Sequence, residues 1–171
     1  MTLSSGLKDR GIQLLLLVVV LNVLAYVLLW SLDLYVNTDL YDYGLEFSYD
    51  WAANYWYNNG MGWGLLASST ALASLSLIPH YIYIKEHSRF SKGVGFLLPT
   101  VAIVYQVLGI FFLFEVNNIV KNQLYDFGLK PNYTWISTVN DFNLAIMILM
   151  IIALLALIIS TIRILDLIKM E

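Results

Sequence analysis

The sequence contains no cysteine, and only 12% of its 171 residues are charged, whereas 60% are hydrophobic. Without cysteine there is no disulfide framework, no thiolate metal site and no redox pair. Soluble domains carry about a quarter charged residues and about half apolar ones. The composition therefore argues against a water-soluble protein.

The motifs of common catalytic sites are also missing from the sequence. There is no H-E-x-x-H zinc motif, no G-x-S-x-G nucleophile elbow and no glycine-rich phosphate loop. These absences favour a non-enzymatic protein, for which we expect no catalytic residues and no cofactor, and we expect no nucleic-acid partner.

Four long stretches lack any Asp, Glu, Lys or Arg: Gly11–Leu32, Gly62–Ile84, Gly93–Phe114 and Phe142–Ile162. About 20 apolar residues in a helix cross the ~30 Å hydrocarbon layer of a bilayer, so each stretch is long enough to span it. Lys8 and Arg10 before the first stretch resemble the basic start of a signal peptide. The stretch is longer than the apolar h-region of a signal peptide, however, and no cleavage site follows it. The sequence predicts an all-α integral membrane protein, in which residues 1–171 form a single membrane domain of four transmembrane helices.

The basic residues predict the orientation of these spans. Seven lie in segments on one side (Lys8, Arg10, Lys85, Arg89, Lys92, Arg163 and Lys169), and only Lys121 and Lys130 lie on the other. Basic residues concentrate in cytoplasmic loops. We therefore expect a multi-pass protein of the cell membrane with both termini in the cytoplasm and with outer segments at 33–61 and 115–141.

A short motif occurs twice in the chain. Leu40–Leu45, with the sequence LYDYGL, recurs as LYDFGL in Leu124–Leu129 at an offset of 84 residues. Unless the resemblance is coincidental, the protein consists of two helical hairpins in tandem, about 11–87 and 95–170, as a parallel internal repeat. Gly44 and Gly128 then end equivalent helices, which continue for about three turns beyond the first and third spans.

The two outer segments are acidic and rich in aromatic residues, which predicts a small folded outer cap. Asp42 and Asp126, the repeated carboxylates, either hold a hard cation such as Ca²⁺ through oxygen ligands or cap the glycine turns. Asn132 begins an N-glycosylation sequon, Asn-Tyr-Thr, in the second outer segment.

Few polar residues occur inside the predicted spans. Asn22 and Gln106 are 84 residues apart and are expected at equivalent mid-membrane positions, where they either bond to each other or line a polar path. We expect the second span to pack closely on its neighbours through a stripe of small residues that includes Gly60, Gly64, Ser68 and Ala71. The fourth span, with few features to distinguish its faces, is expected to be the most lipid-exposed or to contact another subunit.

Two histidines, His80 and His87, lie near the cytoplasmic end of the second span, beside charged residues. A separation of seven residues allows them to share a helical face, but the neighbouring charges favour a plain juxtamembrane loop.

Two functions fit these features best, and a third, weaker interpretation is an enzyme whose donor groups are the acidic residues and tyrosines of the outer segments. The first is an accessory or structural subunit of a larger membrane complex, whose partners are the lipid bilayer and either other membrane subunits or further copies of itself. The alternative is a small channel or transporter built on the internal repeat, with Asn22 and Gln106 along its path. The absence of charged residues within the spans disfavours proton-coupled transport.

Overall fold

The computed structural model describes residues 9–42, 49–86, 89–126 and 133–169. Four helices make up this part of the chain: α2 (Arg10–Asp42), α3 (Tyr49–Glu86), α4 (Arg89–Asp126) and α5 (Tyr133–Lys169). Each contains a segment long and apolar enough to cross a membrane: Arg10–Tyr35, Tyr57–Ile84, Phe90–Val116 and Thr138–Leu165. The all-helical prediction is confirmed, and the four apolar helices fit a multi-pass membrane protein.

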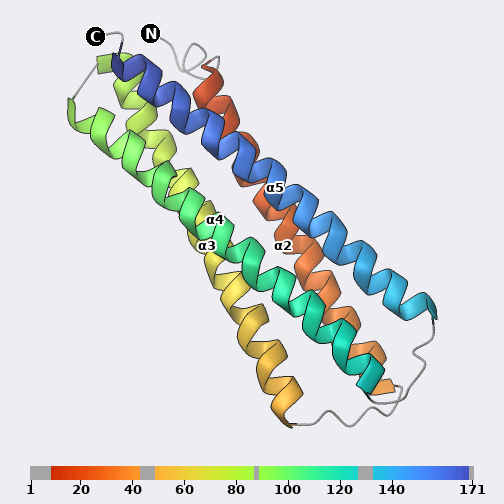
Figure 1. Ribbon diagram of the computed structural model, residues 1–171. Coiled ribbons are helices and arrows are strands. Elements are labelled where there is room, and N and C mark those ends of the chain that lie inside the picture. The colour runs from red at the N-terminus through yellow and green to blue at the C-terminus, as the bar shows by residue number, and fades with distance from the viewer. Residues whose placement is uncertain (1–8, 43–48, 87–88, 127–132, 170–171) are drawn as a thin grey trace.

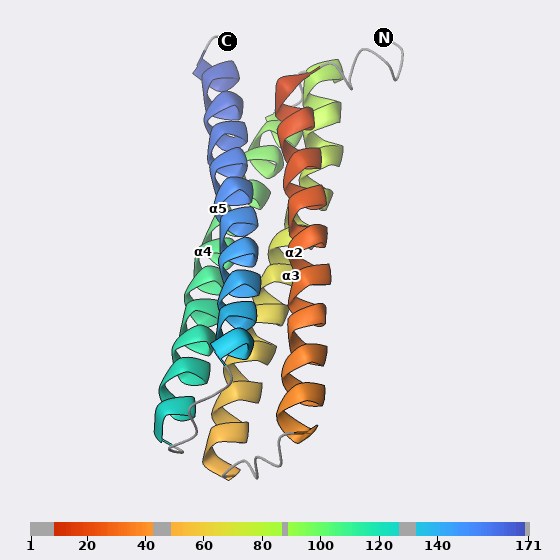
Figure 2. The ribbon, with the colours of Figure 1, turned by 90° about the vertical axis from the view of Figure 1, so that its right-hand side faces the viewer.

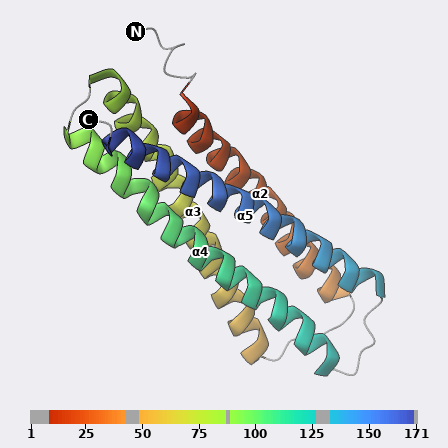
Figure 3. The ribbon, with the colours of Figure 1, turned by 45° about the horizontal axis from the view of Figure 1, so that its top comes forward.

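The helices form an antiparallel bundle in which α3 packs most extensively on α4, and α2 on α5 (Figure 1). The α4–α5 and α2–α3 contacts are smaller and join these two pairs into one bundle. Figure 2 shows the first turns of α2 and α4 at the same end of the bundle as the last turns of α3 and α5. Figure 3 shows α2 beside α5 and α3 beside α4 along the bundle.

The helices α2 and α4 continue well past the predicted spans and end at Asp42 and Asp126, while α3 and α5 begin at Tyr49 and Tyr133. The helical continuation of the first and third spans is thus confirmed. The ends of α2 and α4 are 84 residues apart, and so are the starts of α3 and α5. This is the offset of the repeated motif, although the repeat itself stays a prediction. Gly44, Gly128 and Asn132 lie outside the described residues, as do the side chains of Asp42 and Asp126.

Each helix buries one row of side chains at alternating three- and four-residue steps, which is the packing pattern of left-handed helical bundles. The core has two apolar clusters. One contains Ala25, Leu29, Leu66, Leu113, Ile146 and Met150 among others. The second contains Leu15, Val18, Ala73, Ala102, Ala153, Ala156 and Leu157. In α2 and α4, the boundary between these clusters falls at Asn22 and Gln106.

The small-residue stripe of the second span does not pack on the other helices of this bundle, and close packing on another helix through it stays a prediction. Gly60, Gly64 and Ala71 face outward, and a Cβ atom at Gly60 or Gly64 would have nothing within 4 Å. The buried row of α3 instead contains Gly62, Ser69, Ala73 and Ser76 among others. Small residues at four-residue spacing identify a face that a helix can approach closely, but not which neighbour approaches it.

Of the two expectations for the fourth span, the greatest exposure is not met, and contact with another subunit stays a prediction. Helix α5 has a distinct buried row that includes Ile146, Met150, Ala153, Leu157 and Ile164. In its most apolar 18 residues a third of the positions are buried, as in the first span, against 28% in the corresponding stretches of the other two. Alanines and Ser160 in this row let α5 lie close to α2 and α4, so within this bundle α5 is not the most exposed helix.

Candidate functional site

The centre of the bundle holds a pair of side-chain amides. The Asn22 Nδ2 group donates a hydrogen bond to Gln106 Oε1 at 3.2 Å, and Gln106 Nε2 donates to Asn22 Oδ1 at 3.0 Å. Gln106 Nε2 also lies 3.3 Å from the backbone carbonyl oxygen of Met150, to which it donates. Both amides are completely buried. The pair therefore joins α2 to α4 across the bundle and adds a bond to α5.

This pair meets the requirement that a buried polar group has a hydrogen-bond partner. In an apolar environment an unpaired amide is costly, so the two residues depend on each other. Asn22 and Gln106 are 84 residues apart, the offset of the repeated motif. Two equivalent positions that lie on a two-fold axis would meet in this way. The geometry supports a structural crosslink in the bundle interior.

A second buried polar cluster lies at the end of the bundle where α2 begins. His80 of α3 is 1% exposed, and its Nε2 atom lies 3.1 Å from Asp9 Oδ1. The Asp9 carboxylate also accepts hydrogen bonds from the backbone amides of Gly11 and Ile12, at 2.7 and 3.2 Å. Asp9 is thus the N-cap of α2 and ties this helix end to α3.

The backbone of α2 at Gly11 packs closely against the His80 ring. A Cβ atom at Gly11 would lie 2.5 Å from His80 Nε2, so only glycine fits there without a shift of the imidazole. Ser160 of α5 donates a hydrogen bond to the Gly11 carbonyl oxygen at 3.3 Å. Three helices therefore meet around one histidine, whose buried Nδ1 atom has no hydrogen-bond partner among the described residues.

Two opposing effects act on the pKa of Asp9. Burial raises it, whereas the hydrogen bonds from His80, Ile12 and Gly11 lower it and outweigh burial, so the pKa lies below its ordinary value of 3.8. A carboxyl group with a lowered pKa stabilises the folded state above its unfolded-state pKa. We therefore expect the contribution of Asp9 to be present at neutral pH and to be lost as the pH falls through the lowered pKa.

The opposite end of the bundle has a smaller polar contact. Asn59 Nδ2 of α3 donates a hydrogen bond to Asp33 Oδ1 of α2 at 3.1 Å. Asn59 is 3% exposed, and its Oδ1 atom has no partner among the described residues. Nearby in the bundle, Tyr26 donates to the Trp63 carbonyl oxygen at 2.8 Å and packs edge-on against the Trp63 ring. These contacts link α2 to α3.

The sequence prediction placed His80 in a plain loop, and the structure places it inside α3 in the bundle core. The signal that could have found it is its register, because His80 continues the buried row of Ser69, Ala73 and Ser76 at four- and three-residue steps. His87 lies outside the described residues.

Within the part of the chain that the structure describes, no three His, Asp or Glu side chains are grouped so that they could hold a metal ion. The cation site proposed at Asp42 and Asp126 depends on side chains outside that part and stays a prediction. No known protein family, curated protein or solved structure matches this chain.

Proposed function

We propose that this chain is a multi-pass membrane protein that acts as an accessory or structural subunit of a larger membrane complex. The observation that carries the proposal is the filled interior. Apolar side chains occupy the core on both sides of the Asn22–Gln106 pair, and the amides of that pair bond to each other and to the backbone of α5. Interior polar groups paired in this way stabilise a bundle and leave its outer surface for contacts with other molecules.

The membrane placement is supported by the outer surface of the bundle. Large apolar side chains on the outward faces of all four helices are about half exposed or more, among them Val20, Ile78, Val104 and Leu155. A water-soluble protein rarely exposes apolar area on this scale. Together with the distribution of basic residues, this surface supports a bilayer location with the chain termini and the Lys85–Lys92 segment on the cytoplasmic side.

The outward face of α3 is where we would place a helix of the partner subunit. Gly60, Gly64, Ala67 and Ala71 lie on this face, which is the least bulky part of the outer surface of α3. Small side chains let two helix backbones approach closely within a membrane, where van der Waals contact contributes much of the association energy.

The alternative function, a channel or transporter, needs a route past the amide pair. The meeting of Asn22 and Gln106 at the bundle centre is the observation that favours it, because pseudo-symmetric centres often hold the binding sites of transporters. In that case the pair would have to separate during each transport cycle.

One experiment separates the two functions. A photo-crosslinking residue is placed at Ala67 in native membranes, with a matched control at Val20 on the outward face of α2, and the complex is purified in mild detergent. We expect a crosslinked adduct of one mass at Ala67, none at Val20, and a partner present in fixed stoichiometry in the purified complex. A homo-oligomer that lacks other subunits and conducts ions in liposomes would contradict the accessory role and support the alternative.

A further inference from the structure

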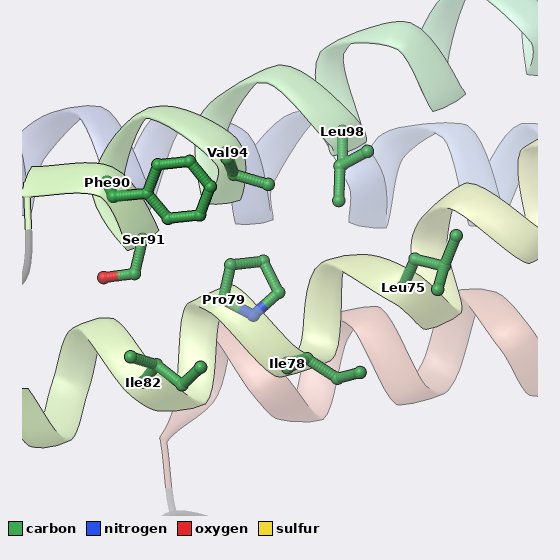
Figure 4. Close-up of a pocket in the computed structure, with 8 residues that line it drawn as sticks. All are labelled: Leu75, Ile78, Pro79, Ile82, Phe90, Ser91, Val94 and Leu98. Atoms are coloured by element: carbon green, nitrogen blue, oxygen red, sulfur yellow. The ribbon is translucent and has the colours of Figure 1, made fainter.

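An apolar groove lies between α3 and α4 near the end of the bundle where these helices are connected. Its walls include Leu75, Ile78 and Ile82 from α3 and Phe90, Val94 and Leu98 from α4, as Figure 4 shows. Its volume is about 320 Å³, within the ~300–1,000 Å³ range of ligand pockets. Ser91, whose side chain is the only polar one in the lining, is 2% exposed, so the groove offers an almost wholly apolar surface.

The groove opens on the outer surface of the bundle. Ile78 is 60% exposed and Phe90 is 79% exposed, the largest exposed fraction of any bulky apolar residue in the described chain. Pro79 forms part of the α3 wall, and α4 lies against the backbone of Pro79 and His80 at Gly95, where a Cβ atom would be in ordinary contact at 3.8–3.9 Å. Both walls are therefore parts of two helices that pack on each other.

Its position along the helices restricts what can fill it. The α3 wall belongs to the last ten residues of the apolar segment Tyr57–Ile84, and the α4 wall to the first nine of Phe90–Val116. The groove thus occupies the depth of one membrane leaflet and ends near the surface, at the connection between the two helices. An acyl chain of a lipid in that leaflet has the polarity and depth that the groove requires.

The charges at this end favour one class of headgroup. Lys85 lies at the end of α3, and Arg89 and Lys92 lie in the first turn of α4, against one acidic residue, Glu86. The Lys92 ammonium group is held 5.8 Å from the centre of the Tyr83 ring. Basic segments at the cytoplasmic membrane surface attract anionic lipids, and basic pockets between membrane helices bind their headgroups.

We infer that the α3–α4 groove binds one acyl chain of an anionic phospholipid, with its headgroup beside the basic helix ends of α3 and α4, at Lys85, Arg89 and Lys92. This inference rests on the proposed membrane placement. That placement is checked first by retention of the protein in the membrane pellet after alkaline extraction, and release of the protein would count against the placement itself. The lipid assay below then tests the site alone.

The assay is native mass spectrometry of the detergent-purified protein with an equimolar mixture of phosphatidylglycerol and phosphatidylcholine of identical chains. Each basic residue near a membrane surface strengthens binding of anionic lipid about fivefold. We expect phosphatidylglycerol adducts to exceed phosphatidylcholine adducts by fivefold or more. In the variant K85Q/R89Q/K92Q the ratio should fall close to one, whereas R163Q, which removes a basic residue of α5, should keep the preference.

A second pair of variants tests the groove. Val94→Trp fills the groove and should remove the tightly bound lipid, while Val104→Trp, on the outward face of α4 but outside the groove, should retain it. Circular dichroism and size-exclusion profiles like those of the wild type establish that each variant is folded. Equal retention of both lipids by the wild type, or unchanged phosphatidylglycerol binding in Val94→Trp, would overturn the inference.

Discussion

Replacing Gln106 with leucine is expected to lower the free energy of unfolding by about 1–3 kcal/mol, because Asn22 would be left buried without a partner. Asn22→Leu should cost less, since Gln106 would keep its hydrogen bond to the Met150 carbonyl oxygen. The measurement is unfolding of the purified protein in mixed micelles, with helicity as the readout.

The double variant N22L/Q106L gives the sharper result. Replacing both partners of a buried hydrogen bond with apolar groups of similar shape can be nearly neutral. We therefore expect the double variant to be more stable than Gln106→Leu, with a coupling energy of about 0.6–2 kcal/mol, as for hydrogen bonds between membrane helices. Additive losses, with the double variant the least stable of the set, would contradict the amide pair.

The second large effect is expected at Gly62, where α3 meets α4. A Cβ atom there would lie 2.8 Å from Leu113 Cδ2 and 3.0 Å from Leu113 Cγ, so a larger side chain must push the helices apart or displace the core. Overpacking of this kind costs about 1–3 kcal/mol. We expect Gly62→Ile to lower the free energy of unfolding by that amount in the same micelle assay.

Gly64 is the matched control for Gly62. It lies two residues away on α3, on the outward face, and an added Cβ atom would have nothing within 4 Å. Gly64→Ile should therefore leave the stability of the isolated protein unchanged or raise it slightly, because isoleucine has a higher helix propensity than glycine. Equal losses at the two positions would show that the outward and inward faces of α3 are wrongly assigned.

The sequence was sufficient to predict the helices but not the faces by which they pack. A stretch such as Gly11–Leu32 is long enough and has no charged residue, so its helix can span a bilayer whichever helices pack beside it. Faces are harder to predict, because lipid and protein core are both apolar and the outward side of a helix need not be polar. For this reason the sequence did not show that the stripe at Gly60 and Gly64 faces outward, and the buried row of α5 was missed.

The polar residues were only partly predictable for a related reason. Asn22 and Gln106 stand out because each is surrounded by apolar residues in the middle of a span. His80 lies near the end of a span beside charged residues, so its environment in the sequence resembles a loop. Its partner, Asp9, is 71 residues away, and only the register of α3 shows that His80 points into the bundle.

The most direct test of the four-span arrangement is the labelling of single cysteines in intact cells. Because the chain has no cysteine of its own, a thiol introduced at Ser88 or at Asn122 is the only one present. Asn59, in the first outer segment, is unsuitable because it is buried. We predict that a membrane-impermeant maleimide labels N122C from outside and labels S88C only after the membrane is permeabilised. Labelling of S88C in intact cells would contradict the proposed orientation, and labelling of both positions would contradict a membrane-spanning bundle.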